Sequence, residues 1–274
     1  MKKISASQIV LNAILIVLLA IMIYPLAMAL WCSLKTTDNY ELTKWYPTFP
    51  LQINNIVTAW NSCYRFIFNT VFVGVVGTVG SLILSSLAGY AYAKINFPGK
   101  SIFFTAMLAL MMIPGVLTLV PSHSLYCSLG MYNSYWSLIL PTAINGSVYG
   151  TFLLVSFFKG VPDSTIEAAR IDGASEYRCF LSIALPLCLP ILGTLSIMKI
   201  TGVWNDYLWP QIIIQDIDKQ LISSGLAFTF TDMYKSNMPI TFAGYLLASL
   251  PLIFLFSLTS KFYVQGLMTS GLKL

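Results

Sequence analysis

Charged side chains are scarce in this sequence of 274 residues. Asp, Glu, Lys and Arg make up 9% of it, whereas a soluble domain carries about 25%. Hydrophobic residues make up 57%, so most of the protein surface faces something other than water. The net charge of +5 comes from short basic clusters beside apolar segments. This arrangement fits lipid headgroups better than nucleic acid, so we expect no nucleic-acid partner.

Residues that carry chemistry are also few. His123 is the single histidine, and the five cysteines contain no CxxC pair, so we expect neither a metal site nor a disulfide framework. No GxxxxGK[ST] loop occurs, and the sequence therefore predicts that the chain does not bind or hydrolyse ATP itself. A GxSxG elbow and paired carboxylates are missing as well. These absences leave no catalytic residues to assign, and they predict a protein that is not an enzyme.

Long apolar runs, in contrast, are present six times, and each is long enough to cross a membrane as a helix. They cover about 9–33, 66–95, 102–123, 135–158, 180–203 and 241–261. The first has about 25 residues, more than the apolar part of a signal peptide, so we expect an uncleaved span. The third carries Pro114-Gly115 and Pro121, and we expect it to be kinked or to end near Pro121, whereas we expect the fourth to be broken by Pro141 and by Asn145-Gly146. Loops are expected at 34–65, 124–133 and 204–239.

Basic residues set the expected orientation, because cytoplasmic loops carry an excess of Lys and Arg. With six spans, nine of them fall on the side of the two termini and five on the other side, with Lys199 inside the fifth span. The sequence therefore predicts an all-α polytopic membrane protein with both termini in the cytoplasm. We expect residues 1–65 to form the first span and an extracellular loop, and residues 66–274 to form a five-helix core.

Small residues recur every fourth position in the second apolar run. They are Gly77, Ser81, Ser85 and Gly89. This spacing places them on one helix face, where small side chains let two helix backbones approach closely. We interpret the stripe as a helix-packing surface and not as a ligand site.

A short polar stretch, residues 163–176, separates the fourth and fifth apolar runs. Ser164 and Glu167 have the spacing of a capping box that would begin a helix. Gly173 is placed to end that helix in the left-handed conformation, and a second helix is expected to start around Ala174-Ser175. The pattern fits equally an ordinary capped loop helix and a rigid charged knob that inserts into another protein.

Specific motifs in and around this stretch resemble a known family. They are Glu167-Ala168-Ala169, Asp172-Gly173-Ala174, Phe180, Ile183, Leu185-Pro186 and Pro190. This pattern resembles the EAA signature of permease subunits in binding-protein-dependent ABC importers. Further matches extend the resemblance to the carbohydrate branch, the maltose-transporter-like second permease, over nearly the whole chain. They are Phe97-Pro98-Gly99-Lys100, Met112-Ile113-Pro114-Gly115, Tyr135-Trp136, Leu140-Pro141, Trp204-Asn205-Asp206, Leu208-Trp209-Pro210 and Tyr263-Val264-Gln265-Gly266-Leu267.

The resemblance implies a type I ABC importer permease fold, in which 163–179 contains the cytoplasmic coupling helices. It implies that the chain lies in the bacterial plasma membrane, imports a sugar or oligosaccharide and forms half of the translocation pathway. The implied partners are a companion permease as heterodimer, two ATP-binding subunits that hold ATP and Mg, and an extracellular sugar-binding protein. The residues implied in coupling to the ATPase are Glu167, Ala168, Ala169, Asp172, Gly173, Leu185 and Pro186.

Candidate residues for the substrate pathway combine aromatic rings with polar groups. They are Asn145, Trp204, Asn205, Asp206 and Trp209. We favour an aromatic belt at the membrane interface for the Trp-rich segment, with sugar binding as the second interpretation. Lys199 is expected near the outer end of its span, where its ammonium can reach the interface, and a pore-lining role is the alternative.

Two other function classes compete with an ABC permease. An ion-coupled secondary sugar transporter usually carries carboxylates inside its spans, but here the apolar runs contain no Asp or Glu beyond Asp206 at an edge. A membrane enzyme would need catalytic motifs that the sequence lacks. The ABC permease is therefore the prediction, with the secondary transporter as its alternative.

Overall fold

The computed structural model describes residues 6–232, 234 and 237–271, and this part of the chain contains helices and no strand. Four of its helices are long and apolar enough to cross a membrane. They are α1 (Ala6–Ser33), α3 (Asn54–Lys94), α6 (Trp136–Lys159) and α13 (Met238–Gly271). Two bent helix pairs raise the number of candidate spans in the described residues to six if each pair is one span. The predicted all-α polytopic fold is confirmed.

The first bent pair joins α4 (Lys100–Leu110) to η1 (Gly115–Thr118) and α5 (Leu119–Ser128) with a bend of 91°. The bend lies at Pro114, as one of the two sequence alternatives predicted. The other alternative, a helix end near Pro121, is wrong, because α5 continues to Ser128. Pro121 lies in the first turn of α5. Backbone N–H groups in the first turn have no partner within the helix, so a proline there costs no helical hydrogen bond.

The second bent pair follows the polar stretch. It begins with α8 (Glu176–Cys179), the π-helix η2 (Phe180–Ala184) and α9 (Leu185–Leu187), and it continues as α10 (Leu189–Asn205) after a bend of 75°. Pro186 and Pro190 lie on either side of the bend. Proline and a π-helical turn are two recognised causes of a sharp bend in a helix.

The expected breaks in the fourth apolar run are wrong, because α6 runs uninterrupted from Trp136 to Lys159. Pro141 has no N–H to donate to the carbonyl of Ser137, four residues earlier. The indole Nε1 of Trp209 donates to that carbonyl instead, at 2.8 Å. A side chain far along the sequence therefore satisfies the polar group that the proline leaves free, and the helix continues.

Three segments expected as loops contain helices. Residues 34–65 include α2 (Thr37–Leu42) and the start of α3, and residues 124–133 include the end of α5. Residues 204–239 include α11 (Leu208–Ile213), η3 (Ile217–Lys219) and α12 (Ile222–Asp232). These helices are short or polar, so they do not show the long hydrophobic run on which the sequence prediction of spans depended.

The chain divides into two compact units. The first contains residues up to Tyr64 together with Gly225–Pro251. Within it the Asn55 amide donates to the carbonyls of Ser33 (3.0 Å) and Lys35 (2.8 Å) and so fixes the start of α3 to the end of α1. The apolar window of α1 has none of its side chains buried, which suits a helix that faces lipid or another subunit.

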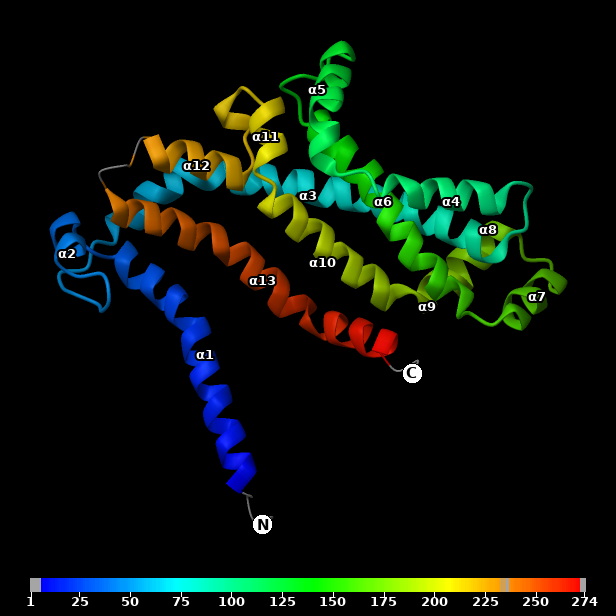
Figure 1. Ribbon diagram of the computed structural model, residues 1–274, viewed down its shortest axis with the longest axis horizontal. Coiled ribbons are helices and arrows are strands. Elements are labelled where there is room, and N and C mark those ends of the chain that lie inside the picture. The colour runs from blue at the N-terminus through cyan, green and yellow to red at the C-terminus, as the bar shows by residue number, and fades with distance from the viewer. Residues whose placement is uncertain (1–5, 233, 235–236, 272–274) are drawn as a thin grey trace. The chain divides into compact units, whose positions relative to one another are not determined.

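The second unit contains Arg65–Ser224 and the residues from Leu252 onward. Its α3 and α6 pack in parallel through small residues (Figure 1). A Cβ atom added at Gly77 would lie 2.7 Å from Thr142, one at Gly146 would lie 2.7 Å from Ser81, and the contacts continue toward the other end of both helices. At that end, Gly150 faces Ser85 and Gly89 faces Leu154. The predicted helix-packing stripe is confirmed.

Candidate functional site

The polar stretch forms helix α7 (Asp163–Ile171), which lies at one end of the second unit beside α8 (Figure 1). Its first turn differs from the sequence prediction. Pro162, not Ser164, occupies the N-cap position, and no side chain caps the helix, so the predicted capping box is wrong. Proline fixes its own φ, here −59°, and α7 begins directly after it, which places Ser164 inside the helix.

Lys94 anchors the start of α7. Its side chain is only 4% exposed, and its ammonium donates to the carbonyl of Val161 and to the carboxylate of Asp163, both at 2.5 Å. This hydrogen bond, together with the lysine charge, lowers the pKa of the Asp163 carboxyl. Because the folded-state pKa is lowered, the contribution of the pair is present at neutral pH and is lost as the pH falls through that pKa.

We expect Lys94→Met to loosen α7 more than Asp163→Asn. Asp163 is 77% exposed, and an asparagine there keeps an oxygen that accepts from Lys94, whereas Lys94→Met removes the donor from both the Asp163 carboxylate and the Val161 carbonyl. Losing a hydrogen bond to a charged group costs about 1.5–3 kcal/mol, so local opening should rise about tenfold or more. The rate of trypsin cleavage at Arg170 in the purified protein measures this opening. Equal cleavage rates in the two variants would contradict the anchoring role of Lys94.

The turn after α7 has the geometry of a Schellman motif. Gly173 has a φ of +81°, its N–H donates to the Arg170 carbonyl at 3.0 Å, and the N–H of Ala174 donates to the Ala169 carbonyl at 2.9 Å. This pair of bonds is the one that closes a helix with a left-handed residue. The predicted left-handed helix end at Gly173 is confirmed.

Side-chain contacts fix α8 against α7 across this turn. The Ser175 hydroxyl accepts the N–H of Arg178 and caps α8 at its predicted start. The guanidinium of Arg170 bonds the Glu176 carboxylate at 2.6 Å, and the Tyr90 hydroxyl donates to the same carboxylate at 3.2 Å. Ile166 is buried against Cys179, with Ala169 packed beside them. The two short helices therefore form one rigid element.

The outer surface of this element carries most of the predicted coupling residues. Glu167, Ala168, Asp172 and Gly173 are exposed, whereas Ala169 is half-buried. Leu185 and Pro186 lie apart from this surface, at the bend before α10, where Leu185 packs on a buried cluster that includes Phe180 and Ala184.

Sequence reasoning missed two apolar residues that flank the turn. Ile171 is 86% exposed and Tyr177 is 66% exposed. Their positions on either side of Gly173 extend the surface of Glu167, Ala168, Asp172 and Gly173, which we call the coupling surface, with apolar side chains. An exposed large apolar side chain next to charged ones is typical of a protein–protein contact. Only the folded element reveals them, because an isolated Ile or Tyr in a sequence carries no such signal.

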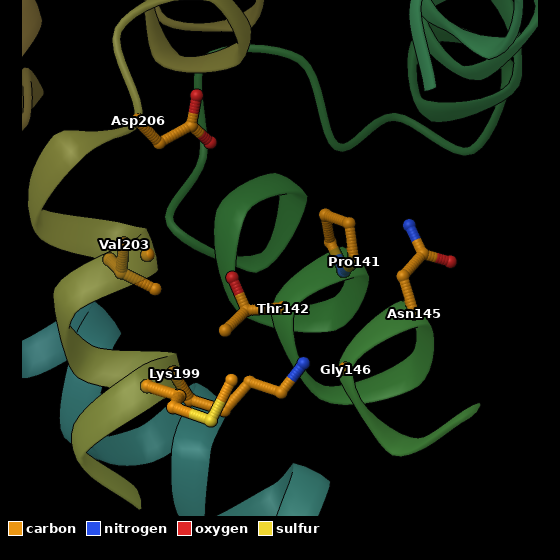
Figure 2. Close-up of a pocket in the computed structure, with 9 residues that line it drawn as sticks. Pro141, Thr142, Asn145, Gly146, Lys199, Val203 and Asp206 are labelled. Carbon is orange, nitrogen blue, oxygen red and sulfur yellow. The ribbon is translucent and has the colours of Figure 1, made fainter. Parts of the chain in front are cut away.

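A second candidate site lies between α6 and α10, where a cavity of about 450 Å³ opens to the surface (Figure 2). It is lined by Pro141, Thr142, Asn145, Gly146, Met198, Lys199, Gly202, Val203 and Asp206. A second cavity, of about 490 Å³, adjoins it. The two share Pro141, Thr142, Asn145 and Asp206, and Trp209 lines the second. Of the predicted pathway residues, the structure therefore brings Asn145, Asp206 and Trp209 together.

The other two predicted pathway residues lie elsewhere. Trp204 is buried, and its backbone carbonyl accepts the Ser223 hydroxyl at 2.6 Å. Asn205 is exposed, and its amide donates to the Thr201 carbonyl at 2.8 Å. Neither residue lines the two cavities. Burial raises the pKa of the Asp206 carboxyl, while the backbone N–H groups of Trp209 and Leu208 act in the opposite direction.

Lys199 also lines the first cavity. The sequence predicted a pore-lining role only as the alternative to a position at the membrane interface. Its ammonium extends across the cavity toward α6 and ends near Gly146 (Figure 2). A Cβ atom added at Gly146 would lie 3.2 Å from that nitrogen, so the glycine leaves the space that the lysine occupies. The expected reach of Lys199 toward the membrane interface is therefore wrong, because its side chain lies in a cavity formed by its own helix and α6.

Comparison with known proteins identifies the family. Residues 81–268 match the model of the binding-protein-dependent transport system inner membrane component. The chain belongs to this family. The match spans α6, the coupling surface and both cavities, so all of the site residues described above lie within it.

Two curated permeases are similar to this permease over most of their length. The probable ABC transporter permease protein YurM of Bacillus subtilis is 31% identical over 251 residues, which cover 91% of this chain and 83% of YurM. The arabinooligosaccharides transport system permease protein AraQ of Halalkalibacterium halodurans is 34% identical over 205 residues, which cover 75% of this chain and 72% of AraQ. Among solved structures, a bacterial ABC transporter involved in the import of the acidic polysaccharide alginate has the same fold. Its TM-score is 0.82 at 19% identity, covering 96% of this chain and all of that one.

Membership defines the general role of this permease. It is a multi-pass membrane component of a binding-protein-dependent transporter. Such a system in general also includes a substrate-binding protein, a partner permease and an ATPase, and ATP is handled by the partner subunits.

Proposed function

We propose that this permease imports a sugar or oligosaccharide as part of an ABC transporter in the bacterial plasma membrane. The observation that carries the proposal is the rigid element of α7, Gly173 and α8, whose exposed coupling surface lies at one end of its unit. The carbohydrate class is supported by the similarity to AraQ, a permease of an arabinooligosaccharide system. No feature of the described residues favours an ion-coupled secondary transporter, because they provide no carboxylate within the long apolar helices of the second unit.

The proposed assembly contains this chain and a companion permease as a heterodimer, two ATP-binding subunits and an extracellular sugar-binding protein. ATP and Mg bind in the ATP-binding subunits, and this chain contributes no catalytic residue. In the proposed orientation both termini and residues 159–179 lie in the cytoplasm, because that side carries the excess of Lys and Arg. In this arrangement residues 1–65 supply the first span and an extracellular segment, and residues 66–274 supply the core.

Each candidate residue has a proposed part in this function. Glu167, Ala168, Ala169, Asp172 and Gly173 form the element that docks on the ATPase, with Ile171 and Tyr177 adding apolar contacts. Leu185 and Pro186 link the element to α10. Asn145, Asp206 and Trp209 line the chain's half of the pathway, while Trp204 and Asn205 support that region without lining it.

Reconstitution of the complete transporter in liposomes tests this proposal. We expect uptake of labelled oligosaccharide to require ATP on the ATPase side and the binding protein on the other side. Omitting either should reduce uptake to background, and an ionophore that collapses proton and sodium gradients should leave uptake unchanged. Uptake that persists without the ATPase and stops with the ionophore would instead establish an ion-coupled transporter.

A further inference from the structure

Lys199 lies near the middle of α10 and its side chain enters the cavity between α6 and α10 (Figure 2). A charged side chain within a membrane-spanning helix is costly, and such residues usually face a water-filled path or a partner of opposite charge. The Lys199 side chain lies in a cavity of about 450 Å³ that opens to the surface. A Cβ atom at Gly146 would lie 2.7 Å from the Ser81 hydroxyl and 3.2 Å from the Lys199 nitrogen, so the glycine leaves room for both α3 and the lysine tip.

No carboxylate in the described part of the chain balances this charge. The nearest interaction of the Lys199 ammonium is with the ring of Tyr149, whose centroid lies 5.9 Å away. Asp206 lines the same cavity, but it lies two helical turns further along, about 10 Å at 1.5 Å per residue. Its carboxylate accepts the N–H of Trp209 at 3.3 Å. The cavity therefore has a free positive group at one end and a hydrogen-bond acceptor at the other.

The chemistry of the lining suits a sugar acid. The Lys199 ammonium is a compact point charge that can pair with one anionic group of a cargo, such as a carboxylate. Pro141, Met198 and Val203 give an apolar wall for the carbon face of a sugar ring. The amide of Asn145 and the carboxylate of Asp206 are placed for hydroxyl groups.

We propose that Lys199 selects carbohydrates that carry a carboxylate, and that it pairs with the uronate group as the substrate crosses this half of the pathway. The proposal rests on the proposed function in sugar import and specifies its substrate class. Asp206 and Asn145 bind hydroxyl groups of the same sugar, which orients the carboxylate toward Lys199. Asp206 repels a uronate paired with Lys199 only weakly, because Asp206 lies about 10 Å further along the helix.

The test is uptake by the complete transporter of a matched pair of disaccharides, digalacturonate and galactobiose of the same linkage. These differ only at C6, where each ring of digalacturonate carries a carboxylate and each ring of galactobiose carries a hydroxymethyl group. We expect the unmodified transporter to import digalacturonate, and Lys199→Met to raise the apparent KM for it at least tenfold. Lys199→Arg keeps the charge and should remain within threefold of the unmodified transporter. Equal recovery of the purified complex from the unmodified transporter and from both variants would show that neither substitution impairs folding.

Each result separates this inference from the proposed function. Uptake of galactobiose alone would overturn the uronate assignment and leave sugar import intact. Uptake of digalacturonate that Lys199→Met does not change would overturn the role of Lys199 alone. Uptake of neither disaccharide, in a transporter that hydrolyses ATP, would overturn the uronate assignment, while sugar import in general is decided by the liposome experiment described above.

Discussion

Gly173→Val is expected to abolish uptake and to release the ATPase subunit, although the permease still inserts in the membrane. A β-branched residue at a φ of +81° is strongly disfavoured, because its side chain clashes with its own backbone. A nine-residue helix is marginal by itself, so loss of the turn separates α7 from α8. We expect uptake below one-tenth of the unmodified level, consistent with a cost of about 1–3 kcal/mol for such backbone strain. Labelled sugar uptake and co-purification of the ATPase measure the two effects.

Gly173→Asn is the matched control for this prediction. Asn adopts the left-handed conformation more readily than other residues, and a Cβ atom at position 173 meets no atom within 4 Å. The added side chain therefore has room, and most of the uptake and ATPase binding should remain. If both variants lost uptake and ATPase binding to the same extent, the left-handed turn would not be the cause of the loss. If Gly173→Val kept uptake and ATPase binding, the proposed docking role would be wrong.

Gly150→Leu is expected to prevent accumulation of folded permease. A Cβ atom at this position would already lie 2.8 Å from the Cβ of Ser85, and the rest of a leucine has no space between α3 and α6. Overpacking by extra methylenes costs about 1–3 kcal/mol. Leucine adds four carbons against the Ser85 side chain, so we expect a larger cost in stability. We expect the yield of monodisperse protein in detergent to fall at least tenfold. Thermal unfolding of any protein that remains should occur at a lower temperature.

Gly202→Leu provides the control for size and hydrophobicity. Gly202 also lies in a membrane helix, α10, but a Cβ atom there meets nothing within 4 Å. Replacing glycine in a helix normally improves helix propensity, so this variant should accumulate like the unmodified protein. A similar loss of yield in both variants would mean that leucine harms the helices in general and that the α3–α6 contact has no special importance.

Local patterns in the sequence predicted the elements that depend on neighbouring residues. The four-residue spacing of Gly77 and Ser81 is sufficient to define a face, and the structure places α6 on it. Gly173 is identifiable because it follows a short helical segment, and few other residues adopt its backbone conformation. Pro114 predicted a bend for the same kind of reason, since proline acts on its own helix turn.

Features that depend on distant partners could not be predicted in this way. The break expected at Pro141 does not occur, because Trp209, 68 positions later, supplies a donor for the free carbonyl. The expected capping box at Ser164 is replaced by an anchor from Lys94, which belongs to another helix. Lys199 faces a cavity whose other wall is α6. In each case the deciding partner is remote in sequence and becomes visible only after the helices have packed.

The bend between α9 and α10 lies between the coupling surface and the cavity that Lys199 lines. Because the two segments meet at 75°, a displacement of α8 along its own axis would move α10 mostly sideways and little along the axis of α10. Lys199 lies ten residues beyond the bend, about 15 Å at 1.5 Å per residue. A rotation of about 10° at the bend would therefore move it by about 2.6 Å. A shift of that size is enough to make or break one hydrogen bond, so such a rotation would change which groups the Lys199 ammonium can reach in the cavity.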